Sequence, residues 1–166
     1  MLKEKETMKL IHYGAKSYKR DLFKSISDIP FSNKPDGGLW TSVIGSEYGW
    51  KEWCEENSFG KLDSSFELEF EGSVMKIDSI ADMNRLPWIN SNGIDIDFVS
   101  FQALCVPTFY YDAIHLTMLG EERTRFPIST MKERERSKFS LTRSLYGWDC
   151  ETVLIMNPNS INVLKN

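Results

Sequence analysis

One segment near the end of the chain constrains the fold more than any other. After Glu151 an apolar, partly β-branched run extends to Met156, which predicts a buried strand. Asp149 stands two residues before Glu151, and residues i and i+2 of a strand face the same way, so the two carboxylates are predicted to share one cleft. A carboxylate at the lip of a buried strand costs free energy unless a polar group engages it. The pair therefore marks a candidate ligand site or, alternatively, an acidic strand edge that discourages aggregation.

The composition fits a single globular domain over residues 1–166. A chain of 166 residues with 41% hydrophobic residues can bury well over half of its unfolded surface. The net charge of −4 argues against a nonspecific nucleic-acid binder, because phosphate binding needs a positive surface. No apolar run approaches a membrane span, and the N-terminal residues show no signal-peptide core, so we expect a cytoplasmic protein without a membrane partner.

The cysteines and histidines predict no metal site. Cys54, Cys105 and Cys150 are odd in number and lack CxxC spacing, so they are expected to be buried, reduced thiols. The two histidines, His12 and His115, lack HExxH or comparable spacing.

The pattern along the chain predicts an α+β fold with mixed or antiparallel sheets and short helices. The predicted strands are Met8–Tyr13, Leu39–Ile44, Phe66–Glu71, Val74–Ile77, Tyr111–Thr117, Glu151–Met156 and Ile161–Leu164. The predicted helices are Ser17–Ile26, Ser46–Glu56, Ser79–Leu86 and Phe98–Leu104. Turn residues at 72–73 and 157–160 predict two hairpins, formed by the strands on either side of each. The region 121–143 is rich in charge, and within it 132–136 is expected to be a solvated, partly helical or mobile segment.

Polar residues mark the ends or starts of three predicted strands, and many aromatic residues lie near predicted turns. The polar positions are His12 with Gly14, Thr41 with Ser42 after a double glycine, and Asp149 with Glu151. The double glycine permits close backbone approach. Aromatic residues beside loops, such as Trp40, Trp50 and Trp148, can wall a stacking pocket for a planar ligand or fill corners of the core.

This arrangement resembles the ADP-ribosyltransferase fold, in which NAD is gripped between two sheets. In that family the first core strand supplies His or Arg, the second supplies Tyr or a Ser-Thr-Ser run, and a late strand supplies Glu, often two residues after Glu or Gln. The resemblance implies that NAD is the substrate and that its nicotinamide–ribose bond is cleaved. ADP-ribose would pass to water or to an unknown acceptor, either a protein or a nucleic acid.

The resemblance also implies a role for each residue. His12 would hydrogen-bond the adenosine-side ribose, and the backbone near Tyr13-Gly14 would hold the nicotinamide amide. The residues Trp40-Thr41-Ser42 would wall the nicotinamide and its ribose. Glu151 would bond the ribose hydroxyl and stabilise the oxocarbenium-like charge that develops as the bond breaks. Asp149 would orient or deprotonate the acceptor.

The chain departs from the family pattern at two of these positions. Trp40 stands where the histidine class has Tyr, so a phenolic hydroxyl is missing, and Asp149 is shorter than the usual Glu or Gln. A second interpretation therefore stays open, in which the same fold is a non-catalytic module that binds a nucleotide or a protein surface.

Other signatures are weaker. His115-Leu116-Thr117 matches one HxT unit of the two-histidine phosphoesterases, which need two. No GxxxxGKS/T, GxGxxG or GxSxG sequence is present, which disfavours a P-loop, a Rossmann site and a serine hydrolase. Basic residues recur at 16–24 and 123–143. The resemblance implies that a phosphate-bearing substrate or a nucleic acid could dock at the second segment, but interspersed glutamates favour ordinary solvated faces.

Overall fold

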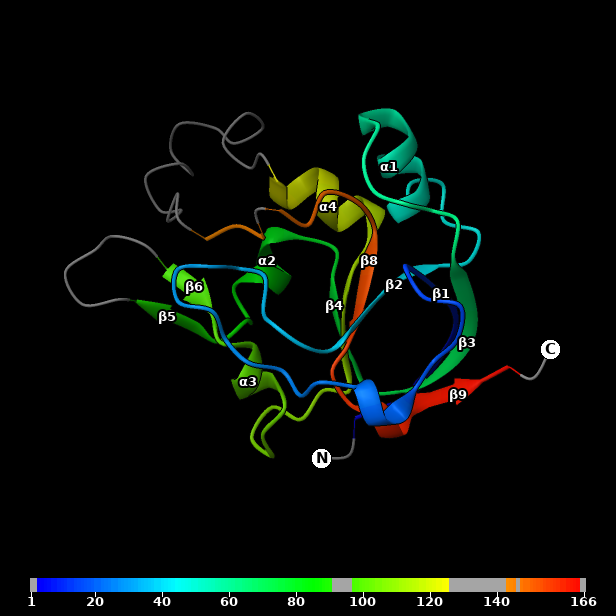
Figure 1. Cartoon of the computed structure of the whole chain (residues 1–166). Helices are drawn as coiled ribbons and strands as arrows, with labels where there is room; N and C mark the ends of the chain where they lie inside the picture. The colour runs from blue at the N-terminus through cyan, green and yellow to red at the C-terminus, as the bar shows by residue number, and fades with distance from the viewer. Residues whose placement is uncertain (1–2, 91–96, 126–142, 146, 165–166) are drawn as a thin grey trace.

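The computed structural model describes residues 3–90, 97–125, 143–145 and 147–164 (Figure 1). Strands in these ranges are β1 (Glu6–Tyr13), β2 (Leu39–Val43), β3 (Ser65–Gly72), β4 (Val74–Ile77), β5 (Trp88–Asn90), β6 (Asp97–Val99), β7 (Ala113–Leu116), β8 (Thr152–Ile155) and β9 (Ile161–Val163). The α-helices are α1 (Trp50–Asn57), α2 (Ile80–Met83), α3 (Phe101–Leu104) and α4 (Met118–Arg125), and two 3-10 turns are η1 (Arg20–Leu22) and η2 (Pro158–Ser160).

Among the described residues, seven strands form one mixed sheet in the order β4-β7-β8-β2-β1-β3-β9, and β5 pairs with β6 in a second sheet. Neighbours in the large sheet are antiparallel apart from the parallel pair β4 and β7. The predicted α+β class, with a mixed sheet and short helices, is confirmed. The ADP-ribosyltransferase-like arrangement of these elements stays a prediction.

Two hydrophobic cores lie on opposite faces of the large sheet, because successive side chains of a strand point to opposite sides. On the buried strand β8, Leu154 belongs to the first core, whereas Val153 and Ile155 belong to the second. The first core lies between the sheet and the short elements α2, β6 and α3. The second core joins β8 to β1, β3 and β9.

The predicted hairpin of β3 and β4 is wrong. β3 pairs with β1 and β9, whereas β4 pairs with β7 at the other end of the strand order. Asp112, just before β7, holds the connection, because the N–H and the hydroxyl of Ser73 both donate to its Oδ2 atom, at 2.7 and 2.9 Å. These bonds direct the chain from β3 to the β7 side of the sheet instead of reversing it.

The predicted hairpin of the last two strands is also wrong. β8 lies between β7 and β2, whereas β9 is the edge strand beside β3. Between them, Asn157 accepts a hydrogen bond from the backbone of Asn159 at 3.0 Å and donates to Oδ1 of Asp112 at 2.6 Å. The connection is therefore an anchored 3-10 turn that leads away from β8.

The predicted helix Ser17–Ile26 is wrong too, because only the short turn η1 forms within it. Tyr18 and Phe23 pack against the second core, whereas Ile26 enters the first. Leu22 is exposed. A single helical face could not deliver these side chains to opposite sides of the sheet.

Other elements match in kind but differ in extent. The helix predicted from Ser46 begins at Trp50, because Oγ of Ser42 accepts the Trp50 N–H at 2.9 Å and caps that end. The segment predicted as the helix Phe98–Leu104 is divided between β6 and α3, and the helix predicted over Ser79–Leu86 is the shorter α2. The segment 132–136, predicted to be solvated and partly helical or mobile, lies outside the described residues.

The cysteine prediction holds in part, since Cys54 and Cys150 are buried free thiols whereas Cys105 is exposed. No helix within the described ranges is long and apolar enough to cross a membrane.

Candidate functional site

A cavity of about 360 Å³ lies where β1 and β2 diverge, and most of the predicted site residues meet there. Its walls come from the end of β1, from β2, from the start of α1 and from residues 147–152, which lead into β8. Of the eight residues singled out from the sequence, six line it: His12, Tyr13, Trp40, Thr41, Ser42 and Asp149. Gly14 and Glu151 are not among the lining residues.

His12 is placed by the divergence of the strands. The β1–β2 register runs through Leu10 opposite Val43 and Ile11 opposite Ser42. Beyond it, Nδ1 of His12 lies 2.8 Å from the carbonyl oxygen of Trp40. A carbonyl oxygen only accepts, so Nδ1 carries the hydrogen, and in the neutral imidazole Nε2 presents a lone pair. The ring thus bonds to β2 through one nitrogen and can accept a ligand hydroxyl with the other.

Tryptophans form the aromatic walls, and each is held by a neighbour. Trp40 and Trp148 meet edge to face at 4.8 Å, and the indole N–H of Trp148 donates to the carbonyl of Asn33 at 2.6 Å. Trp50 stacks on Trp53 at 5.1 Å. The Nζ atom of Lys34 lies 5.8 Å from the Trp40 ring, which places a cation beside an aromatic wall.

The polar groups of β2 and of Gly14 are engaged within the protein. The Thr41 hydroxyl donates to the Val153 carbonyl at 2.7 Å, and Oγ of Ser42 caps α1. The N–H of Gly14, a residue with a φ of 106°, donates to the Ser64 carbonyl at 2.8 Å. A ligand amide would therefore have to use other backbone atoms near Tyr13.

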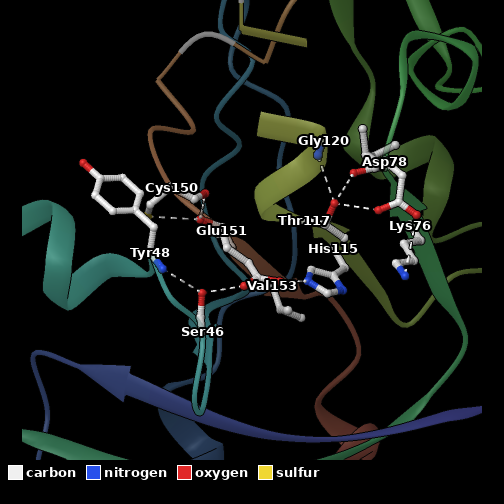
Figure 2. A network of polar contacts seen from close by, with 12 residues as sticks. Ser46, Tyr48, Lys76, Asp78, His115, Thr117, Gly120, Cys150, Glu151 and Val153 are labelled. Atoms are coloured by element: carbon white, nitrogen blue, oxygen red, sulfur yellow. Dashed lines mark hydrogen bonds and ion pairs between the residues drawn. The ribbon is translucent and has the colours of Figure 1, made fainter. Parts of the chain in front are cut away.

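Glu151 is engaged by two side chains that do not line the cavity. Its Oε2 atom accepts from the Ser46 hydroxyl at 2.5 Å, and its Oε1 atom lies 2.8 Å from Nε2 of His115 (Figure 2). Its N–H donates to the carbonyl of Tyr48 at 3.0 Å. The predicted common cleft for the two carboxylates is thus not formed, because Asp149 lines the cavity whereas Glu151 does not.

His12 and Glu151 nevertheless lie close in the strand order. His12 follows Ile11, the partner of Ser42 on β2, and Glu151 lies two residues before Val153, the partner of Thr41. Continued by these registers, His12 lies level with Thr41 and Glu151 level with Val43, so the two residues flank β2 two positions apart along it.

The surroundings of Glu151 keep it ionised. Burial alone would raise the pKa of its carboxyl group, but hydrogen bonds from His115 and Ser46, with the nearby charge of Lys76, lower that pKa below its ordinary value. Lys76 also pairs with Asp78 at 3.6 Å, and Asp78 accepts from the Thr117 hydroxyl at 2.6 Å. Figure 2 shows His115 between Glu151 and this second group.

A second cavity, of about 370 Å³, lies on the other side of His12. Lys16 and Lys19 line it, together with Tyr18, Phe66 and residues at the start of β2. His12 lines both cavities, so its imidazole forms part of the wall between them.

Sequence reasoning missed several members of these sites. The HxT pattern was the signal by which the sequence marked His115. Its place on a strand before a polar turn was a second signal for a functional group. Ser46 and Lys34 carried no sequence signal, because their contacts with Glu151 and Trp40 join positions that are far apart in the chain.

The fold and site define an α+β protein with an aromatic-walled cavity and two nearby carboxylates. No protein-family model, no curated protein and no solved structure matches this chain. Within the described residues, no group of three His, Cys, Asp or Glu side chains could hold a metal ion.

Proposed function

We propose that this chain binds NAD, cleaves its nicotinamide–ribose bond and transfers ADP-ribose to an acceptor. The observation that carries the proposal is the convergence of His12, Tyr13, Trp40-Thr41-Ser42 and Asp149 on one cavity. These residues match the order of ADP-ribosyltransferase motifs and come from parts of the chain that are more than 130 residues apart.

The chemistry of the cavity suits the nicotinamide end of NAD. Its ring is planar and, in NAD, positively charged. Tryptophan faces attract such a ring through stacking and cation–π interactions, each worth about 0.5–2 kcal/mol. Asp149 adds a carboxylate to the same cavity. Once nicotinamide leaves it is neutral, so these attractions weaken and its release is favoured.

The second cavity suits the phosphates. Lys16 and Lys19 line it, and ammonium groups bind phosphate as point charges. A dinucleotide that passes His12 would place its nicotinamide in the first cavity and its pyrophosphate in the second. The imidazole would then lie beside the riboses and accept a hydroxyl hydrogen at Nε2.

The carboxylates would carry the bond-breaking step. As the glycosidic bond breaks, its electron pair leaves with nicotinamide, and the ribose carbon becomes an oxocarbenium-like cation. Glu151 is held ionised, and its sequence neighbours Cys150 and Thr152 line the cavity, so its charge would act on this cation from just beyond the cavity wall. An acceptor hydroxyl, amine or water then attacks the carbon, and its proton passes to Asp149 as general base.

Nicotinamide release from NAD tests this proposal. We expect turnover by the wild type and a loss of about 100-fold or more in Glu151→Gln, because that change removes the stabilising charge. The thermal shift produced by NAD should be retained in this variant. Glu67→Gln, an exposed carboxylate on β3, is the matched control and should keep full turnover. Equal turnover in Glu151→Gln would refute the assigned role.

A second candidate is a module that binds a nucleotide without cleaving it. The observation in its favour is that Ser46 and His115 engage Glu151 outside the lining of the cavity. This candidate predicts a saturable thermal shift with NAD or ADP-ribose and no nicotinamide release by the wild type. The absence of any shift would refute it.

A further inference from the structure

We infer that His115 is a positioning residue, whose Nε2–H fixes the orientation of the Glu151 carboxylate beside the cavity. This inference rests on the proposed function. It assigns to His115 a role that none of the sequence motifs contains.

The strand register brings the two residues together. His115 on β7 pairs with Val153 on β8, and Glu151 precedes Val153 by two residues. Residues two apart on a strand share a face, so His115 and Glu151 are diagonal neighbours on that face. Both side chains are largely buried, with 10% of the His115 and 14% of the Glu151 side chain exposed.

The hydrogen-bond chemistry of this pair has one direction. An ionised carboxylate only accepts, so Nε2 of His115 must donate to Oε1 across the 2.8 Å contact. Nδ1 is buried and has no partner among the described residues. The Nε2–H tautomer therefore places the ring hydrogen on the nitrogen that contacts Oε1 of Glu151.

Ser46 holds the second oxygen of the Glu151 carboxylate. Its hydroxyl donates to Oε2, while its own oxygen accepts from the N–H of Tyr48 at 3.3 Å. One donor thus comes from β7 and the other from the loop after β2, so rotation of the carboxylate would break at least one bond. Each carboxylate oxygen keeps a second lone pair, so it has the capacity to accept one further hydrogen bond.

The charge of Lys76 also acts on Glu151, and Lys76 pairs with Asp78 at 3.6 Å. Glu121 is a further carboxylate in this region, because its charge acts on the neighbouring Cys150 and Tyr48. In the described part of the chain, the side-chain hydrogen bonds of Glu151 are those to His115 and Ser46. The orientation of the carboxylate therefore depends on His115 and Ser46, and Lys76 acts only through its charge.

The test compares His115→Leu, which removes the donor, with His115→Gln, whose side-chain amide can donate from a similar position. We expect kcat for nicotinamide release to fall by about 10-fold to 100-fold in His115→Leu, as the loss of a hydrogen bond to a charged group implies. His115→Gln should recover most of that loss. The Kd of NAD should stay within about twofold of the wild type in both variants.

A pH profile separates positioning from general stability. Without the His115 donor the carboxyl group of Glu151 is easier to protonate, so the acid limb of kcat should move to higher pH in His115→Leu. Arg143→Gln is the matched control, because it breaks the 2.8 Å ion pair with buried Asp97, away from both cavities. It should lower stability without moving the acid limb. If His115→Leu fails to fold, Ser46→Ala carries the same prediction through the other oxygen.

The outcomes distinguish the inference from the function on which it rests. Full activity and an unmoved acid limb in a folded His115→Leu would overturn the positioning role alone. A wild type that binds NAD without releasing nicotinamide would overturn the proposed enzyme and the positioning role with it. Loss of kcat with rescue by His115→Gln would support both.

Discussion

At the residue scale, Asp112 is a buried carboxylate whose contacts join three segments of the chain. Its side chain accepts two hydrogen bonds from Ser73 and one from Asn157. Its carbonyl oxygen also accepts the N–H groups of Met156 and Asn157. These bonds explain why β4 leaves β3 and why β9 leaves β8, since both connections are tied to the start of β7.

Replacement of Asp112 should destabilise the protein strongly. We expect Asp112→Ala to lower the free energy of unfolding by about 3 kcal/mol or more, because three donors would lose their acceptor in a buried site. Urea unfolding at neutral pH measures this loss. Asp63→Ala, an exposed carboxyl in a loop, should stay within about 0.5 kcal/mol of the wild type. Equal losses in the two variants would contradict the role of Asp112.

Glu151 should link stability to pH. Its pKa is lowered in the folded state, so the stability that it contributes is present above its unfolded pKa and is lost as the pH falls through the folded pKa. The free energy of unfolding should therefore be higher in the wild type than in Glu151→Gln at neutral pH, and the gap should narrow in acid. Unfolding curves of both proteins between about pH 7 and pH 3 test this, and a constant gap would contradict it.

At the element scale, β2 is the strand on which the site depends, because it lies between β1 and β8 and supplies Trp40, Thr41 and Ser42. Its start approaches β8 closely. A Cβ atom on Gly38 would lie 2.7 Å from Cδ1 of Leu154 and 2.9 Å from the carbonyl oxygen of Ile155. The double glycine predicted to allow close approach does so here.

A pair of glycine variants isolates this contact. Gly38 and Gly45 have positive φ values of 68° and 86°, so alanine is strained at both positions. Only Gly38 also lacks space, since nothing lies within 4 Å of a Cβ on Gly45. We expect Gly45→Ala to cost about 1 kcal/mol and Gly38→Ala clearly more, by about 1–3 kcal/mol. Thermal unfolding of both variants is the measurement, and equal losses would contradict the close approach.

At the scale of the whole molecule, two cores share one sheet. Strand β8 contributes to both, since Leu154 faces one core and Val153 the other. A substitution that destabilises either core should therefore also destabilise the other, through β8 and β2.

We expect the described fold to unfold as one cooperative unit. Phe70→Ala in the second core and Phe101→Ala in the first should each cost about 3–5 kcal/mol, because both side chains are fully buried. Circular dichroism and tryptophan fluorescence should report the same midpoint in each variant. Separate midpoints would show that the two cores unfold independently.

Local patterns in the sequence predicted many elements well. The alternation of Phe66, Leu68 and Phe70 with glutamates indicated β3, and the apolar run after Glu151 indicated the buried strand β8. These predictions succeed because strand periodicity is written in consecutive residues. The class α+β followed from the mixed order of the elements.

The helix predicted over Ser17–Ile26 shows where local patterns mislead. Its apolar spacing fits a helix, but Phe23 and Ile26 belong to different cores. The spacing of residues says that side chains are buried, not which core receives them. The same limit applies to Glu151, whose place two residues after Asp149 suggested a shared cleft.

The sequence alone established the α+β class, the position of most strands, the burial of strand β8 and the set of polar and aromatic residues near strand ends. Only the tertiary structure decided which strands pair, which of those residues share a cavity, and that Glu151 turns toward Ser46 and His115. The physical reason is that periodicity is local, whereas strand pairing and hydrogen bonds such as Ser73 to Asp112 or His115 to Glu151 join residues 36 or more positions apart.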